Sequence, residues 1–166
     1  MVDSRDAAEP VSSPVAYIER THRYYQAQGF EQVYQYAHFE DTPFVRPNKP
    51  LSECRVGLIT TASLTHRPPL SPRRVASTDI EPAPERLFTD DLSWDKQATH
   101  TNDLNSYCPI ATLKDLNNEG FIGGLTPRLH CAPTEYSQRA TREKDAPELL
   151  RRLKIDGADV VLLVPL

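Results

Sequence analysis

The chain has 166 residues, 39% of them hydrophobic, and a net charge of −4, so it is long enough for one domain with a substantial core. The acidic balance and the lack of any basic block exclude the electrostatic footprint of a nucleic-acid or anionic-membrane binder. No apolar run approaches the ~20 residues that span a bilayer, and the first residues lack the apolar core of a signal peptide. The three widely spaced cysteines argue against a disulfide framework, and we therefore expect a cytoplasmic protein.

The N-terminal part is predicted to be a flexible segment followed by a helix. Residues 1–13 are polar, and Pro14 is well placed to open the helical pattern that follows it. Val15, Ile18, His22 and Tyr25 fall on one face of that helix. We expect its aromatic side chains to serve packing, onto a sheet or a partner, rather than ligand stacking.

Two apolar runs predict the strands that organise the fold. The first, Arg55–Leu64, reads RVGLITTASL, and the second, Ala158–Leu166, reads ADVVLLVPL. Their Val, Ile and Leu residues are consecutive rather than alternating with polar residues, which is typical of strands buried on both faces. The proline-rich segment 65–92 between them contains Val75–Thr78, which is able to add an edge strand.

The rest of the chain predicts two further helices. One begins at Ile110 and ends at Gly120, and the other begins at Thr141 and ends at Gly157. Between them, residues 121–125 are predicted to be a short strand or turn and residues 126–138 a loop. This layout predicts an α/β fold: a single domain over 14–166, with a largely parallel sheet, flanking helices and long proline-rich loops.

Hydroxyl side chains follow the first predicted strand at its carboxyl end. In open parallel sheets, ligands bind just beyond the carboxyl ends of the strands. Thr60, Thr61 and Ser63 are therefore candidate substrate-binding residues, which would hold an anion with their hydroxyls and backbone N–H groups. The sequence contains no glycine-rich dinucleotide loop, no P-loop and no GxSxG nucleophile elbow, which excludes those three classes of site.

His100 and Asp103 place an imidazole and a carboxylate three residues apart. If both side chains point into a cleft, they are suited to acid–base catalysis or to sharing a cation. The alternative is a loop histidine beside an aspartate that caps a helix or an Asx turn. The spacing of the two residues alone favours this second interpretation.

The cysteines leave two interpretations open. Cys108 directly precedes Pro109 at a helix start, where the helix dipole favours a thiolate, but the same residue fits a buried position. Cys131 follows His130 and Arg128, which are able to lower a thiol pKa. Adjacent residues of an extended segment point to opposite sides, so His130 is not expected to act on Cys131. The cysteine spacings match no metal-ligand pattern, and we expect no metal site.

Three segments together resemble the selenoprotein B subunit family, which comprises subunits of glycine, sarcosine and betaine reductases and of D-proline reductase. The segments are RVGLITTASL, DLSWDKQATHTNDLNSYCPIATLKDLNNEGFIGGLTPR and DAPELLRRLKIDGADVVLLVPL. The likeness runs from about Val15 to Leu166. Its most specific parts are the His-Thr-x-Asp segment, the EGxIGxL-P-R stretch and the terminal strand.

The resemblance implies a reaction: reductive cleavage of a C–N bond in a small amino acid or amine, with a dithiol as electron donor. It also implies a pyruvoyl group on a partner subunit, and a selenocysteine or cysteine directly after the terminal strand. Because this sequence stops at Leu166, two explanations are open: a short relative without redox chemistry, or a reading frame closed at a UGA codon for selenocysteine. We favour the second.

The resemblance also implies a pocket around His100, Asp103, Arg128 and the turn at Thr60 and Thr61. We therefore take His100, Asp103 and Cys108 as candidate catalytic residues. Arg128 and His130 join the three hydroxyl residues as candidate substrate-binding residues. Many family members have a second histidine where this chain has Asn102, which disfavours a two-histidine or metal site and leaves the substrate class open. We expect other reductase subunits or a second copy of the chain as partners. The alternatives are a non-catalytic substrate-binding or assembly subunit of the same fold and, with less support, a non-redox hydrolase or lyase that uses His100 and Asp103.

Overall fold

The computed structural model describes residues 16–32, 35–66, 72–90, 92, 97, 100–134 and 137–166. The chain divides into two compact units, Met1–Thr42 and Pro43–Leu166. In the first unit, the predicted helix is confirmed as α1 (Tyr17–Ala27), and none of its residues is buried. The segment 1–13, Pro14 and Val15 lie outside the described residues, and the single domain over 14–166 stays a prediction.

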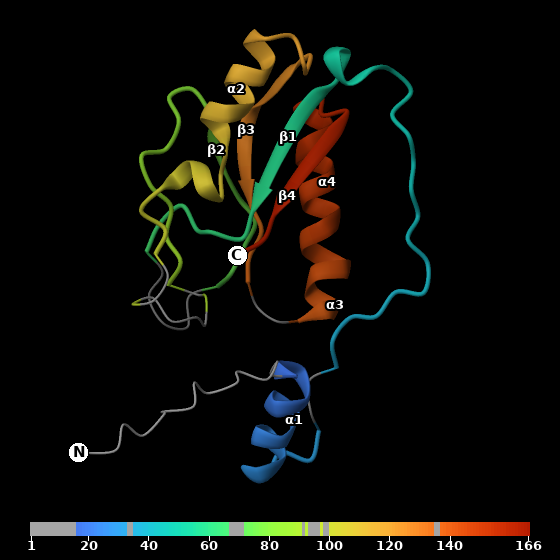
Figure 1. Cartoon of the computed structure of the whole chain (residues 1–166), viewed down its shortest axis with the longest axis vertical. Helices are drawn as coiled ribbons and strands as arrows, with labels where there is room; N and C mark the ends of the chain where they lie inside the picture. The colour runs from blue at the N-terminus through green and yellow to red at the C-terminus, as the bar shows by residue number, and fades with distance from the viewer. Residues whose placement is uncertain are drawn as a thin grey trace, which may run out of the picture. The chain divides into compact units, whose positions relative to one another are not determined.

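The second unit contains one mixed sheet, which confirms the α/β class (Figure 1). Its described strands are β1 (Arg55–Thr60), β2 (Ala76–Asp79), β3 (Gly124–Cys131) and β4 (Val160–Val164). They lie in the order β2-β3-β1-β4. Strand β1 pairs in parallel with both β3 and β4, and β2 pairs antiparallel with β3. The sheet is therefore largely parallel, with β2 as an antiparallel edge strand close to the predicted position.

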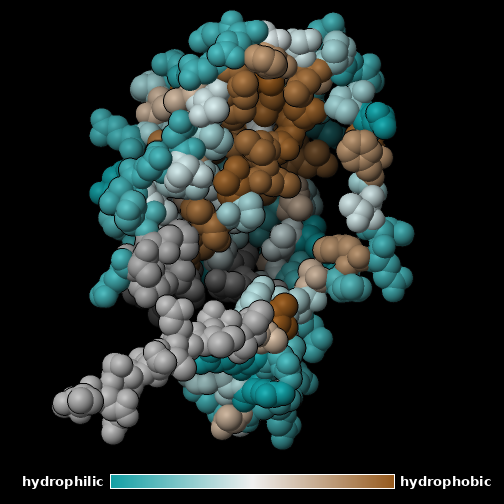
Figure 2. Space-filling model, in the orientation of Figure 1, coloured by the Kyte–Doolittle hydropathy of each residue, from teal (hydrophilic) through white to brown (hydrophobic). Residues whose placement is uncertain are grey.

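The two apolar runs are neighbouring parallel strands, as predicted. Their register runs from Val56 opposite Val160 to Thr60 opposite Val164. Every residue of β1 after Arg55 is buried. The prediction that the last strand is buried on both faces is wrong, because Val161, Leu162 and Leu163 of β4 are 41%, 38% and 65% exposed. Figure 2 shows apolar side chains gathered on the face where β1 and β4 lie.

The predicted loop 126–138 is wrong over its first half, because Thr126–Cys131 belong to strand β3. Strand β3 is irregular: Val56 pairs with Leu125, whereas Leu58 pairs with Leu129. The extra residues form a bulge that contains Pro127. A bulge tolerates proline because its residues need not donate to the ladder. Across the other edge, Pro127 accepts a hydrogen bond from the Ile80 N–H at 3.0 Å.

Helices cover the two faces of the sheet. Residues of β1 alternate between these faces. Val56 and Leu58 pack with Ile110 and Leu113 of α2 (Ile110–Asn118), whereas Ile59 packs with α4 (Ala146–Ile155). The short α3 (Gln138–Ala140) and the π-helical turn η3 (Thr141–Asp145) lead into α4.

Both sheet-covering helices stop at a glycine with positive φ, as predicted. Gly120 follows α2 with φ of 77°, and Gly157 follows α4 with φ of 73°. This left-handed conformation carries little cost only for glycine. The chain then turns into β3 and β4 respectively.

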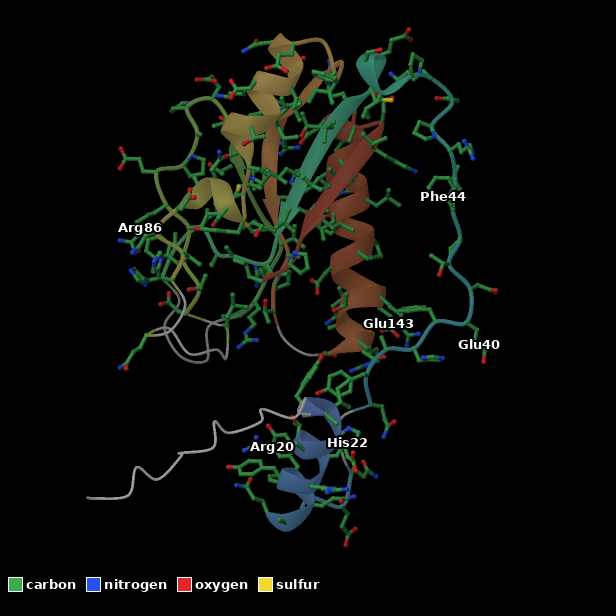
Figure 3. All side chains as sticks on the ribbon, viewed as in Figure 1. Arg20, His22, Glu40, Phe44, Arg86 and Glu143 are labelled. Carbon is green, nitrogen blue, oxygen red and sulfur yellow. The ribbon has the colours of Figure 1, made fainter. Side chains whose placement is uncertain are left out.

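An extended segment leads to the first strand through the short 3-10 helix η1 (Leu51–Glu53). Phe44, labelled in Figure 3, lies on this segment with 78% of its surface exposed. In the part of the chain that the structure describes, no helix combines the length and the apolar character needed to cross a membrane.

Candidate functional site

The carboxyl ends of β1 and β4 are tied together by a side chain. The Leu166 N–H donates to Thr61 Oγ1 at 2.8 Å. Thr60 is 1% exposed, and its hydroxyl accepts from the Ala62 N–H at 3.3 Å. Ser63 is also buried. Its backbone N–H donates to the Phe88 carbonyl, and its own carbonyl accepts from the Phe88 N–H. Of the three predicted anion-binding hydroxyls, only that of Thr61 belongs to a half-buried residue, and it bonds to the backbone of Leu166.

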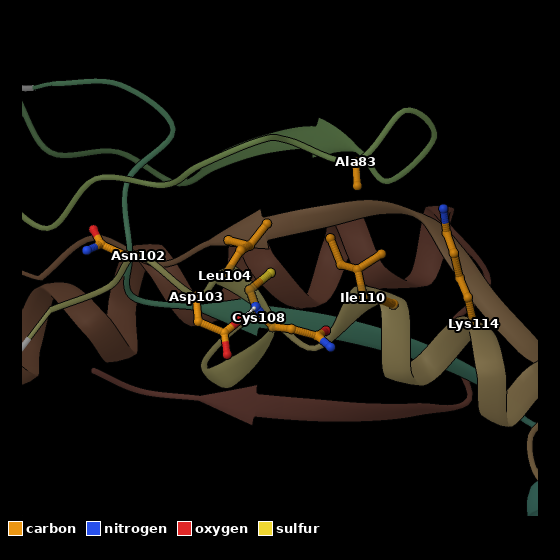
Figure 4. A pocket seen from close by; sticks show the side chains of 9 residues that line it. Ala83, Asn102, Asp103, Leu104, Cys108, Ile110 and Lys114 are labelled. Carbon is orange, nitrogen blue, oxygen red and sulfur yellow. Dashed lines mark hydrogen bonds between the residues drawn. The ribbon is translucent and has the colours of Figure 1, made fainter.

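A hollow of about 340 Å³ lies beside α2 and is called the α2 hollow. Its polar lining comes from Asn102, Asp103, Asn105 and Lys114, and its apolar lining from Ala83, Leu104, Cys108, Ile110 and Ala111. In the view of Figure 4, Cys108 and Ile110 lie between Asp103 and Lys114. One carboxylate and one ammonium therefore flank a largely apolar floor.

The α2 hollow lies on the face of the sheet that α2 covers. Leu104 lines the hollow and packs against an apolar cluster that includes Ala62, Cys108 and Leu166. Lys114 lines the hollow from α2 and pairs with Glu81, which follows β2.

His100 and Asp103 adopt the second of the two predicted arrangements. His100 is exposed in a loop, and its Nδ1 lies 3.5 Å from the Asn102 N–H. Asp103 precedes the 3-10 helix η2 (Leu104–Ser106) and caps it, because its carboxylate accepts from the Asn105 N–H at 3.0 Å. Asp103 lines the α2 hollow, whereas His100 does not.

Of the two interpretations of Cys108, a thiolate at a helix start or a buried thiol, the structure shows the buried one. Only 1% of the surface of Cys108 is exposed. Burial raises the pKa of this thiol to about 11, because the apolar surroundings disfavour the thiolate. Cys54 and Cys131 are also buried, and none of the three cysteines, all of which the structure describes, is in a disulfide. Cys108 is therefore a packing residue rather than a thiolate, and Cys54 and Cys131 also lie in the packed interior.

We expect the native protein to react with iodoacetamide at Cys108 at least ~100-fold more slowly than the urea-unfolded chain at pH 8. With a pKa of about 11, only about one Cys108 thiol in a thousand is ionised at that pH. Mass spectrometry of samples quenched over time would measure the two rates. Rapid labelling of Cys108 in the native protein, with the other two cysteines unmodified, would return it to the list of candidate nucleophiles.

Arg128 and His130 lie on the opposite face of the sheet, beside α4, and not with Asp103. The Arg128 guanidinium is bound to Asp156, with Nε 3.0 Å from Oδ1 and Nη2 2.6 Å from the same oxygen. The His130 Nε2 lies 3.1 Å from Asp156 Oδ2, without the geometry of a hydrogen bond. The Asp156 side chain is 4% exposed, and the Arg128 guanidinium is the cation that compensates this buried charge.

Ser77 connects His130 to Arg152 of α4. Its Oγ lies 2.8 Å from His130 Nδ1 and accepts a hydrogen bond from Arg152 Nη1 at 2.7 Å. Because the hydroxyl accepts from Arg152, its own hydrogen is directed to His130 Nδ1. The imidazole proton then sits on Nε2, toward the Asp156 carboxylate. We call Ser77, His130, Asp156 and Arg152 the polar chain.

Burial lowers the pKa of His130. The Asp156 carboxylate opposes this effect, whereas the guanidinium groups of Arg128 and Arg152 add to it. The imidazole is therefore neutral at pH 7 and able to accept the Ser77 hydrogen bond. His130 is fully buried, and the half-buried Ser77 lies between it and Arg152.

Ser77, Arg152 and Asp156 were not predicted from the sequence. Ser77 is within the predicted edge strand, and the cross-strand pair with His130 depends on a register that the sequence does not indicate. Asp156 precedes Gly157 and has the pattern of an ordinary helix end. The only available signal was the i, i+4 spacing of Glu148, Arg152 and Asp156, which places all three on one face of the helix.

The described residues contain no group of three His, Cys, Asp or Glu side chains placed to hold a metal ion. A comparison with protein-family models, curated proteins and solved structures found no match for this chain.

Proposed function

We propose that the chain is the substrate-binding part of a cytoplasmic reductase of the glycine, sarcosine, betaine or D-proline type. The observation that carries the proposal is the pair of opposite charges in the α2 hollow, Asp103 and Lys114. A small amino acid has an ammonium and a carboxylate that complement this pair, and the apolar floor suits its short side chain. The volume of about 340 Å³ is within the range of small-molecule sites.

Asp103 and Lys114 each have a polar partner within the protein. Lys114 forms an ion pair with Glu81, and Asp103 accepts from the Asn105 N–H. Such bonds fix the position of a side chain before a ligand arrives, which reduces the entropy lost on binding. A carboxylate has about four lone-pair sites, so Asp103 keeps acceptors for a substrate ammonium.

In the proposed reaction a dithiol supplies two electrons and two protons, and the C–N bond breaks. One proton forms a new C–H bond at the α-carbon, the other is taken up by the nitrogen, and the dithiol becomes a disulfide. The amine is released from the open-chain substrates and stays attached to the opened ring of D-proline. A thiolate or selenolate has to attack the α-carbon. The raised pKa of Cys108 disfavours that role for it. The proposal therefore takes the reactive atom from the residue that follows the terminal strand in the family, or from a partner subunit.

The pKa of Cys108 also favours the second candidate, a non-catalytic substrate-binding subunit of the same fold. The two candidates share the ligand and differ in turnover. With partner subunits and dithiothreitol present, formation of the product with a cleaved C–N bond supports the reductase, and binding without such a product supports the binding subunit. A UGA codon after the Leu166 codon, followed by a reading frame with a cysteine, would independently support the reductase.

We expect isothermal titration calorimetry to detect binding of at least one of glycine, sarcosine, betaine and D-proline. Asp103→Asn and Lys114→Gln should each weaken that binding by at least ~10-fold, because each removes one charge-assisted contact. Asp115→Asn is the matched control, because Asp115 lies on the same helix but does not line the hollow. No binding of any of the four compounds, or equal loss in the control, would refute the proposed substrate site.

A further inference from the structure

A second hollow, called the α4 hollow, lies on the other face of the sheet and has a volume of about 400 Å³. One wall is the segment that leads into β2, with Arg73, Arg74 and Val75. The other wall is η3 and α4, with Lys144, Asp145, Glu148 and Arg152. Segments like η3, in which the helix is locally π-helical, are frequent at functional sites.

The charge of the α4 hollow is opposite to that of the chain. Arg73, Arg74, Lys144 and Arg152 supply four positive charges, against two negative charges from Asp145 and Glu148. The lining thus has an excess of two positive charges in a chain whose net charge is −4. Cations gathered on the walls of a concave surface raise the local concentration of anions.

Arg152 is held in a fixed position at this hollow. Its Nε donates to Glu148 Oε1 at 2.7 Å, and its Nη1 donates to Ser77 Oγ at 2.7 Å. These bonds use two of the five N–H donors of the guanidinium. The rest of the polar chain is buried behind Ser77, because His130 is 0% and Asp156 is 6% exposed.

A buried polar network of this kind is costly to assemble unless every member has a partner. The outermost member of the polar chain is Arg152. Its side chain is 23% exposed and lines the α4 hollow. The arrangement fixes the plane of the guanidinium, which is what bidentate recognition of an oxyanion requires.

We propose that the α4 hollow binds a small anion with two negative charges, either a phosphate or a dicarboxylate, with Arg152 as its central ligand. The two negative charges match the excess of two positive charges. Ser77, His130 and Asp156 are positioning residues, because they orient Arg152 without lining the hollow. The site is on the opposite face of the sheet from the α2 hollow, so it does not depend on the reductase proposal.

The experiment is an NMR titration of the full-length chain labelled with ¹⁵N, with inorganic phosphate and succinate added separately, each up to about 10 mM. We expect saturable shifts of the Arg152 Nε–H signal with at least one of the two anions, and weaker binding as NaCl is added. Saturation with phosphate alone assigns a phosphate ligand, and saturation with succinate alone assigns a dicarboxylate. No saturable shift with either anion overturns the proposal.

Four variants separate binding from folding. Arg152→Gln and Arg74→Gln should each weaken binding by at least ~10-fold, because each removes a cation from the lining. Ser77→Ala should weaken it by several-fold while every cation of the hollow remains. Arg151→Gln is the matched control, because Arg151 also bonds to Glu148 but does not line the hollow. Circular dichroism melting checks that each variant is folded. Equal loss of binding in Arg151→Gln and Arg152→Gln would also overturn the proposal.

Discussion

Replacement of Asp156 by asparagine is expected to lower the free energy of unfolding by about 3 kcal/mol. The substitution preserves shape and removes the buried charge that Arg128 and His130 face. The Asp156 side chain is 4% exposed, whereas that of Arg128 is 32% exposed. The loss comes from the groups left without the carboxylate: the Arg128 guanidinium, which water reaches only in part, and the fully buried His130.

Urea denaturation of the wild-type chain and of Asp156→Asn would measure this difference. Asp115→Asn is the same chemical change at an exposed position of α2, and it should alter the free energy of unfolding by less than ~0.5 kcal/mol. A double-mutant cycle with Arg128→Gln should give a coupling energy of at least ~1 kcal/mol. A coupling energy near zero would mean that the pair contributes nothing beyond its separate members.

Replacement of Gly123 by alanine should cost about 3 kcal/mol of the free energy of unfolding. A Cβ atom there would lie 2.5 Å from the Glu53 carbonyl carbon and 2.8 Å from its Cα. These are backbone atoms of η1, which is separated from β1 by Cys54 alone, so they cannot rotate away as a side chain does. Gly123 also donates its N–H to the Cys54 carbonyl at 2.9 Å, which holds the start of β1 against the start of β3.

Gly57→Ala is a matched comparison for Gly123→Ala. A Cβ at Gly57 would lie 2.6 Å from Leu153 Cδ2, the far end of a flexible side chain. Since that leucine is able to change rotamer, Gly57→Ala should cost only about 1 kcal/mol. Thermal melting of both variants would show which of them loses more stability. If Gly123→Ala were the more stable of the two, the backbone contact at Glu53 would not be rigid.

The sequence predicted the class of the fold and the central strand pair, because consecutive apolar residues are a strong signal. It failed at β3. Residues 126–138 were predicted to be a loop, whereas Thr126–Cys131 belong to β3, which accommodates Pro127 in a bulge. Local composition cannot indicate such a bulge, because it depends on the register of strands far apart in the sequence.

The sequence also failed at the polar chain, for a different reason. Ser77, His130 and Asp156 come from three separate elements, and none has a local pattern that distinguishes it from a strand or cap residue. The predicted residues Asp103 and Cys108 do line one hollow, but they serve there as a cap and a buried thiol. The EGxIGxL-P-R stretch has a partial explanation, since one of its glycines, Gly123, has no room for a side chain.

Strand β4 holds to the rest of the sheet along one side only, because in the ranges that the structure describes only β1 pairs with it. Half of its peptide groups therefore face solvent and must be hydrated, and its exposed leucines gain little from burial. Local opening should begin there at a lower free energy than in β1. Because Leu166 anchors Thr61 directly after this strand, fraying of β4 would loosen the carboxyl edge while the buried core stays folded.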